Sequence, residues 1–301
     1  MVKRLSAEIL LFITVVIYSL NFTAAKFALE NGFEPLTWSS TRFVIAAAIF
    51  ATLTWNREGT LKVARVDVKW FALMALVGVV LNQVVFSYAL EQSSASSTSL
   101  VFGTFPIFVA LIASAVGIEN LYRRHWIAAG VSFGGVALVA IGSRGEAFDG
   151  GLVGILLGLG ISLTWAAYSV GVKPLLARYS PYQVSAWVMI IGAVPLTLVS
   201  LAQLFGQDWG MIADLAWFAW IYTLVVGLVL ANVTYFTSID RVGAARASLY
   251  LNLQPFLGAL FAVAILSEKL TFAQIIGGAI IACGIVISRG FKRPKLRSWL
   301  A

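Results

Sequence analysis

Long apolar runs limit the possible folds of this chain more than any other feature. Charged and turn-forming residues separate the runs from one another. A helix needs roughly 20 mostly apolar residues to cross a bilayer, and only helices and closed barrels satisfy their backbone polar groups in lipid. With 60% hydrophobic and 11% charged residues, the chain is unlike a soluble domain. We predict an all-α integral membrane protein with ten transmembrane helices, near residues 7–28, 36–55, 70–90, 95–117, 125–142, 151–172, 182–203, 215–238, 244–266 and 272–289.

The distribution of basic residues predicts the orientation in the membrane. Lys and Arg accumulate in cytoplasmic loops. If both termini are cytoplasmic, all 21 Lys and Arg residues lie on the cytoplasmic side except Lys26, Arg42, Arg144 and Lys269. The sequence therefore predicts a multi-pass protein of the cell membrane, plasma or inner, with cytoplasmic N- and C-termini. The net charge of +8 then reflects contact with lipid headgroups, and we expect no nucleic-acid partner.

The second half of the chain echoes the first. The segment SSTSLVFGTFPIFVALIASAVGIE at 96–119 returns 149 positions later as ARASLYLNLQPFLGALFAVAILSE, and YSLNFTAAK at 18–26 matches WAAYSVGVK at 165–173. Each copy holds five of the predicted spans, and an odd number makes the second copy enter the membrane from the opposite side. We predict two inverted five-helix repeats, at 1–148 and 149–301. This architecture is typical of transporters whose substrate lies near the midplane, between the repeats.

At these segments the chain resembles the drug/metabolite transporter superfamily, and within it the amino-acid and metabolite exporters built from two EamA domains. The resemblance rests on the five-plus-five duplication, on STRFVIAAAIF in the second span, and on ASLYLNLQPFLGALFAVAILSEKLT at 247–271. It covers nearly the whole chain. It implies export or exchange of small polar metabolites, amino acids among them, and leaves the substrate open. The first copy has GTFP where the second has NLQP, so polar contacts from Asn252 or Gln254 lack a counterpart.

Polar and aromatic residues deep in the spans are the candidates for a substrate site. An unpaired polar group at membrane depth costs several kcal/mol, so it usually faces a cavity or a partner helix. Rings and amides together suit a substrate with an apolar side chain and a polar head. The alternative for an amide is an interhelical hydrogen bond, and for a ring it is packing or contact with lipid. The predicted site comprises Tyr18, Asn21, Trp38, Arg42, Asn82, Gln83, Trp165, Tyr168, Trp187, Asn232, Tyr250 and Asn252.

Arg42 is the only deep basic candidate in the sequence. It follows Pro35 by seven residues, which is about 10 Å along a helix. It either faces the cavity, to bind a substrate carboxylate or hold the outer gate through a neighbouring amide or carboxylate, or extends outward to the lipid surface. Its counterpart in the second repeat, Val188 or Met189, is apolar. A midplane of amides and rings favours neutral or aromatic amino acids over phosphates, which call for several basic groups.

The acidic residues and two prolines bear on mechanism. No Asp or Glu falls in the middle of a predicted span, which predicts weak or absent proton coupling and hence uniport or exchange. Pro106 and Pro255 should each bend a helix and serve as hinges for alternating access; the alternative is that they only shape packing. Thr271 and Gln274 form a capping box that starts the last span, which leaves Glu268 as a loop carboxylate that can cap a helix.

Other functional classes find little support. The single histidine, His125, lies at a span end, and the single cysteine, Cys283, has no thiol partner. An enzyme needs a nucleophile with a base, or metal ligands, so we predict no enzyme, no metal and no cofactor. A channel-like facilitator is harder to separate from a carrier, because pore-lining amides look similar. Export of other metabolites or drugs also stays open. The expected partners are a small-molecule substrate and the bilayer, for a monomer or a weak homo-oligomer.

Overall fold

The computed structural model describes residues 7–117, 123–142, 151–242, 250, 251 and 253–289. Within these residues every regular element is a helix. The chain runs through α1 (Ala7–Glu30), α2 (Pro35–Glu58), η2 (Arg65–Asp67), α3 (Val68–Ala75), η3 (Leu76–Leu81), α4 (Asn82–Gln92), α5 (Ala95–Phe102), α6 (Phe105–Ala115), α7 (Arg123–Gly142), α8 (Gly151–Gly171), α9 (Lys173–Leu176), α10 (Pro181–Gly206), η4 (Trp209–Met211), α11 (Asp214–Ile221), η5 (Tyr222–Leu230), α12 (Ala231–Val242), α14 (Gln254–Leu266) and α15 (Phe272–Arg289).

The helical class is confirmed, and several helices have the dimensions of membrane spans. Among the residues that the structure describes, seven helices are long and apolar enough to cross a bilayer: Glu8–Glu30, Pro35–Glu58, Arg65–Gln92, Ala95–Ala115, Leu152–Leu176, Pro181–Gly206 and Asp214–Ile239. The helices α7, α14 and α15 lie where the other three spans are expected, and the apolar parts described in α14 and α15 are shorter. The number ten and the orientation of the termini remain predictions.

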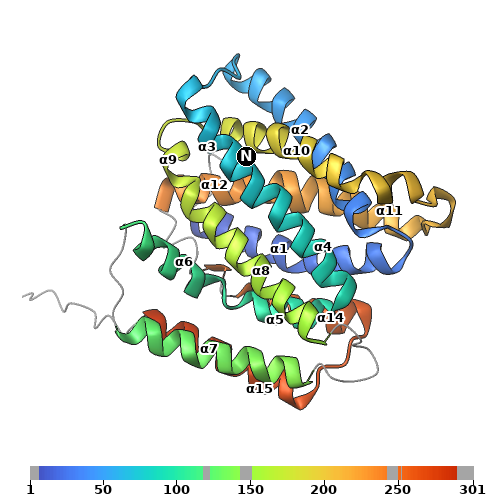
Figure 1. Cartoon of the computed structure of the whole chain (residues 1–301), viewed down its shortest axis with the longest axis vertical. Coiled ribbons are helices and arrows are strands. Elements are labelled where there is room, and N and C mark those ends of the chain that lie inside the picture. Colours follow the sequence, from blue (N-terminus) through green and yellow to red (C-terminus); the bar gives the residue numbers. More distant parts are fainter. Residues whose placement is uncertain (1–6, 118–122, 143–150, 243–249, 252, 290–301) are drawn as a thin grey trace, which may run out of the picture.

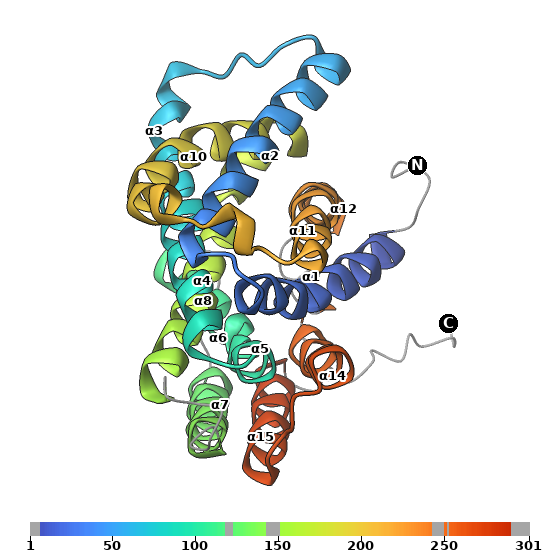
Figure 2. The ribbon, with the colours of Figure 1, turned by 90° about the vertical axis from the view of Figure 1, so that its right-hand side faces the viewer.

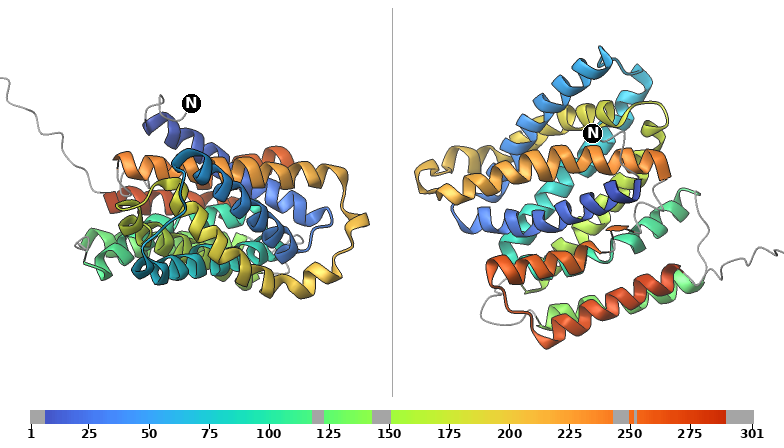
Figure 3. Two further views of the ribbon diagram at one scale, coloured as in Figure 1. Left: turned by 90° about the horizontal axis from the view of Figure 1, so that it is seen from above. Right: turned by 180° about the vertical axis from the view of Figure 1, so that it is seen from behind.

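Helices from the two halves of the chain pair in a regular pattern. The most extensive contacts join α7 with α15 and α2 with α10, and each of these helices packs against its own counterpart in the other half. The helix α5, in the fourth predicted span, also packs against α14, in the ninth. In contrast, α1 packs against α12 while α4 packs against α8, so these positions exchange partners. Figures 1 and 3 show the α7–α15 pair side by side at one edge and α1 beside α12. This is the pattern that the predicted inverted repeats would produce, and the inverted relation of the two halves stays a prediction.

The bundle has two apolar cores. The larger surrounds α1 and holds the largest buried rings, among them Trp38, Phe71 and Tyr235. A smaller one lies where α7 and α15 meet α5, α8 and α14. Figure 2 shows the α7–α15 pair as a separate layer at the bottom of the molecule. A Cβ on Gly135 or Gly277 would lie within 3.0 Å of the opposite backbone, so two glycines permit this close helix contact.

The two prolines stand in the first turns of helices, Pro106 in α6 and Pro255 in α14. The fourth span breaks between α5 and α6, with Pro106 in the first turn of α6. At the break, Gly103 and Thr104 each donate a 3.0 Å backbone hydrogen bond to the carbonyl three residues back. Pro255 likewise stands in the first turn of α14. A first-turn N–H has no partner within the helix, so proline is tolerated best there. The hinge role of both prolines stays a prediction.

The start of α5 is capped by a carboxylate from the other half of the chain. The two carboxylate oxygens of Glu268 accept hydrogen bonds from the backbone N–H groups of Ala95 (2.9 Å) and Ser96 (3.0 Å). These N–H groups have no partner within the helix, and the helix dipole favours a negative charge at this end. Glu268 therefore joins the α14–α15 loop to α5.

The predicted capping box at the start of α15 is confirmed. Thr271 N donates to Gln274 Oε1 over 2.7 Å, and Gln274 N donates to Thr271 Oγ1 over 3.3 Å. The Nε2 of Gln274 also donates to Ser97 Oγ over 2.8 Å. One side chain thus starts α15 and ties it to the first turn of α5.

Candidate functional site

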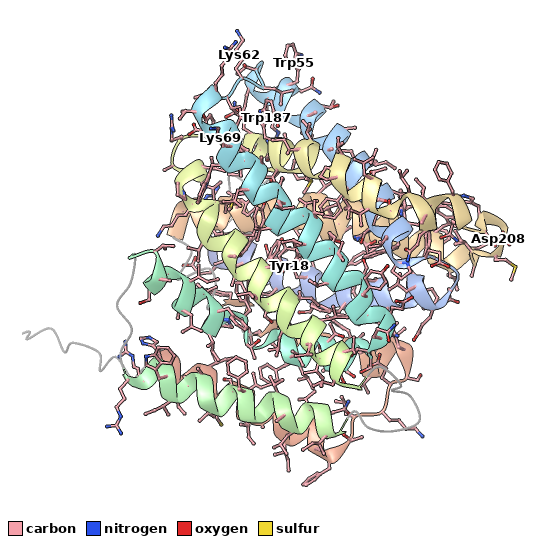
Figure 4. The ribbon with its side chains drawn as sticks, in the orientation of Figure 1. Tyr18, Trp55, Lys62, Lys69, Trp187 and Asp208 are labelled. Carbon is pink, nitrogen blue, oxygen red and sulfur yellow. The ribbon has the colours of Figure 1, made fainter. Side chains whose placement is uncertain are left out.

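A cavity lies in the middle of the bundle, between the two halves of the chain. The cavity has a volume of about 90 Å³. Figure 4 shows Tyr18 near the centre of the molecule, with Lys62 and Lys69 toward one end and Asp208 at the other. The cavity is lined from α1, α2, η3, α4, α5, α8, α10, η5, α12 and α14. Eight of the residues predicted from sequence line it: Tyr18, Asn21, Arg42, Asn82, Gln83, Trp165, Tyr168 and Asn232.

Arg42 is buried at the cavity wall, with 3% of its surface exposed. Its Nε donates to the carbonyl of Trp38 over 3.1 Å, and its Nη2 donates to Gln83 Oε1 over 3.2 Å. Its guanidinium carbon lies 3.1 Å from the centre of the Trp38 ring, a cation–π contact. The side chain therefore faces the interior of the bundle, and it does not extend along the lipid surface.

The guanidinium of Arg42 has no carboxylate partner in the part of the chain that the structure describes. The ion pairs found there join Lys26 to Glu30 and Arg178 to Asp67. A buried charge is usually paired, because the cost of removing it from water is large. One amide, one carbonyl and one ring stabilise Arg42 without neutralising its charge. The site can therefore accept an anionic group.

Two neighbouring amides orient Arg42 through a chain of hydrogen bonds across three helices. Gln83 Oε1 accepts from Arg42 on α2, and Gln83 Nε2 donates to Asn82 Oδ1 over 3.2 Å. Asn82 Nδ2 in turn donates to Thr164 Oγ1 on α8 over 2.9 Å. For Asn82 the structure therefore shows the interhelical hydrogen bond that the sequence left as an alternative. Asn232 of α12, by contrast, donates from Nδ2 over 2.7 Å to the carbonyl of Leu228, which lies one helical turn earlier in the same span.

Aromatic rings from α1 and α8 form a wall of the cavity, and Tyr235 of α12 packs against two of them. Trp165 lies 6.0 Å from Tyr18, 5.4 Å from Tyr168 and 6.2 Å from Tyr235, between ring centres. Tyr18 and Tyr235 meet edge to face at 6.1 Å. Such contacts hold rings rigidly and add to the stability gained by burial. The cavity thus combines one cationic group with an aromatic wall.

Three of the other predicted residues do not line the cavity, and the fourth, Asn252, lies outside the described residues. Trp38 is fully buried behind Arg42 and stacks at 6.1 Å on Phe86. Trp187 donates from Nε1 to the carbonyl of Leu61 over 2.7 Å, which ties α10 to the α2–α3 loop. Tyr250 packs half-buried against the larger apolar core.

Two glycines at the cavity were not singled out from the sequence, although the repeat offset could have identified them. Gly78 and Gly227 are 149 positions apart, and each lies in a π-helical segment, η3 or η5. A Cβ on Gly78 would lie closer than 3.0 Å to the ring of Tyr168, and one on Gly227 closer than 3.0 Å to the Oδ1 of Asn21. Tyr168 and Asn21 are themselves separated by the offset of 147 that relates their helices. π-Helical turns often mark functional sites.

The fold and its central cavity define a polytopic helical membrane protein with a site between two halves. The model of the EamA-like transporter family matches the chain twice, over residues 5–141 and 152–290, so the chain belongs to that family. It is 26% identical to the uncharacterized transporter YyaM of Bacillus subtilis, over 97% of both chains. It is 24% identical to a probable terminal-alkyne amino-acid exporter of Streptantibioticus cattleyicolor, over 92% of this chain and 91% of that protein. A crystal structure 18% identical in sequence shares the fold, with a TM-score of 0.65 over 94% of this chain and 96% of the other.

Proposed function

We propose that this protein is a secondary transporter that exports or exchanges small amphipathic carboxylates, above all neutral or aromatic amino acids. The observation that carries the proposal is the guanidinium of Arg42, buried at the cavity wall without a carboxylate partner among the described residues. A substrate carboxylate would supply the missing negative charge. Arg binds carboxylates strongly because it can donate two parallel hydrogen bonds. The Gln83 contact uses Nη2 and leaves Nη1 available.

The aromatic wall supports an apolar side chain on the substrate. Tyr18, Trp165 and Tyr168 line the same cavity as Arg42, so a substrate held by its carboxylate can place its side chain against the rings. A phosphate ester fits less well, because Arg42 is the one basic residue among the described residues that line the cavity. Phosphate binding usually needs several basic groups. The Streptantibioticus relative is a probable terminal-alkyne amino-acid exporter, which agrees with this substrate class.

The mechanism that we propose is alternating access between the two halves. Helices from both halves of the chain line the cavity, which supports this mechanism, and broken helices beside substrate sites are common in transporters. The breaks beside Pro106 and Pro255 are the proposed places of bending. The described cavity lining contains no Asp, Glu or His, so we propose uniport or exchange without strong proton coupling.

Counterflow in proteoliposomes tests this function. Purified protein preloaded with unlabelled phenylalanine should accumulate labelled phenylalanine transiently and saturably, with or without a pH gradient. Arg42→Ala should lower the counterflow rate about tenfold or more, because a hydrogen bond to a charged group contributes roughly 1.5–3 kcal/mol. Arg65→Ala, which removes an exposed arginine that does not line the cavity, should match the parent.

Four results would contradict parts of the proposal. An Arg42→Ala protein that inserts and folds and keeps the parent rate would remove Arg42 from the substrate site. Movement of a phosphorylated sugar and of no amino acid would replace the substrate class. Flux without saturation or counterflow would indicate a channel-like facilitator, and strong accumulation driven by a pH gradient would indicate proton coupling.

A further inference from the structure

Gly78 and the ring of Tyr168 lie in close contact at the cavity wall. The Tyr168 ring lies against the α-carbon of Gly78 so closely that an added Cβ would come within 3.0 Å of three ring atoms, Cγ, Cδ1 and Cδ2. Both residues line the cavity, and Tyr168 is 97% buried. A methyl group at position 78 would therefore force the ring to move.

The surroundings of Tyr168 restrict the direction of that movement. The ring of Trp165 lies 5.4 Å away between centres, and the ring of Phe236 lies 5.9 Å away, edge to face. Close-packed rings leave little room for a shift. The cavity is the open side, so a displaced Tyr168 ring would occupy space that a substrate would otherwise use.

The equivalent position in the other repeat carries a smaller group. Gly227 is 149 residues after Gly78 and accommodates the amide of Asn21, where Gly78 accommodates a phenol ring. The two glycines thus create matched recesses in the π-helical segments, which receive side chains of unequal size. The backbone is π-helical at both glycines, whereas the side chain that fills the recess differs between the two halves.

We infer that Gly78 and Tyr168 are specificity-determining residues that set the largest apolar side chain the cavity admits. Gly78 lets the Tyr168 ring lie back against η3, which keeps the cavity deep enough for an aromatic side chain beside Trp165. This inference rests on the proposed function, since it assumes that amphipathic carboxylates occupy the cavity. It adds a prediction about size that the charge of Arg42 does not make.

The test compares counterflow of tryptophan with counterflow of alanine in the full-length protein. Gly78→Ala should lower the tryptophan-to-alanine rate ratio about tenfold, because the displaced ring excludes the larger side chain while alanine still fits. Tyr168→Leu alone should raise the ratio above that of the parent. The double variant, Gly78→Ala with Tyr168→Leu, should restore it to about the parent value, since the shorter side chain removes the clash.

Gly160→Ala is the matched control. Gly160 also lies in the bundle, on α8, but a Cβ there would meet Val85 at an ordinary contact distance of 3.5 Å, and the residue does not line the cavity. Its ratio should equal that of the parent. If Gly78→Ala slows both substrates equally, or if Tyr168→Leu leaves the ratio unchanged, the size filter is wrong while the proposed function stands. If the parent moves neither amino acid, the proposed function and the filter both fail.

Discussion

The loops at the two ends of the bundle are held together by different kinds of contact, although these loops occupy equivalent positions in the two halves of the chain. At one end the α1–α2 loop meets the α10–α11 segment through Gln203 and Gln207; we name this the glutamine end. At the other, the α2–α3 segment meets the α8–α10 connection through Asp67, and we name this the aspartate end. Figure 4 labels Asp208 at the first and Lys62 at the second.

Neutral hydrogen bonds hold the glutamine end. Gln207 Nε2 donates to the carbonyl of Gly32, and Gln207 Oε1 accepts from Glu34 N, both over 2.8 Å. Gln203 Oε1 accepts from Leu36 N over 2.7 Å. Gly32 has a φ of 107°, and a Cβ there would lie 2.8 Å from the carbonyl oxygen of Met211. The close loop contact therefore requires glycine.

Charged groups hold the aspartate end. Asp67 accepts from Arg178 Nη1 over 2.6 Å and from the hydroxyl of Tyr179 over 2.5 Å. The Tyr179 hydroxyl accepts from Ala64 N over 3.0 Å, and Ser180 donates to Glu58. Solvent reaches part of this end, since the Arg178 side chain is 54% exposed.

The comparison shows that equivalent contacts in a duplicated fold can respond differently to the solution. Hydrogen bonds between neutral groups depend little on ionic strength, whereas an exposed ion pair is screened by salt. If the protein alternates between two open states, the balance between them follows the difference between the two sets of contacts. Three changes should separate the two ends, beginning with the largest expected effect.

Asp67→Ala should open the aspartate end. The variant loses a hydrogen bond with Arg178 and one with Tyr179, together about 1–2 kcal/mol after allowing for the exposure of Arg178. The fraction open at this end should rise about tenfold. Spin labels at Lys62→Cys and Ala177→Cys, in a Cys283→Ser background, report the distance. A second pair at Glu34→Cys and Phe205→Cys reports the glutamine end, which should not open. An unchanged Lys62–Ala177 distance distribution would show that Asp67 does not hold this end.

Gln207→Ala should open the glutamine end by a smaller factor. Two neutral hydrogen bonds are lost, and water replaces them once the loop separates, so the net cost is about 1 kcal/mol and the shift about fivefold. The same two label pairs measure it, and here the Glu34–Phe205 distance should lengthen. Asn31→Ala is a suitable control, because the carbonyl of Asn31 that accepts from Ala213 N belongs to the backbone and survives the change. Equal opening of both ends in Gln207→Ala would contradict the separation.

Salt should have the smallest effect and act on one end. Raising the ionic strength from about 0.01 M to 1 M shortens the screening length from about 30 Å to about 3 Å, which weakens the Asp67–Arg178 pair by a few tenths of a kcal/mol. The Lys62–Ala177 pair should therefore report about a twofold increase in the open fraction, and the Glu34–Phe205 pair none. In Asp67→Ala this salt dependence should disappear; if it persists, other charges cause it.

The sequence predicted cavity-lining residues correctly where the depth of a polar residue in its span was sufficient information. Tyr18, Asn21 and Asn232 were selected because a polar group near the middle of a span needs a partner or a cavity, and all three line the cavity. Trp187 shows the limit of that argument. Its neighbours Val188 and Met189 line the cavity, while Trp187 itself hydrogen-bonds to the α2–α3 loop. Successive residues on a helix point about 100° apart. When a span is apolar on all sides, its sequence does not indicate which residues point toward the cavity.

The sequence by itself determined the helical class, the places of the apolar helices along the chain, the two matching halves and the polar residues available at mid-depth. Each depends on local composition or on repetition along the chain, and both can be read directly from the sequence. Only the tertiary structure decided that Arg42 lies on Trp38 beside Gln83, that Glu268 caps α5, and that Gly78 receives the ring of Tyr168. These contacts join residues from 4 to 173 positions apart, and packing between helices brings the distant pairs together. That packing depends on which face each helix turns toward its neighbours. Apolar side chains can face lipid as readily as another helix, so their pattern does not specify that face.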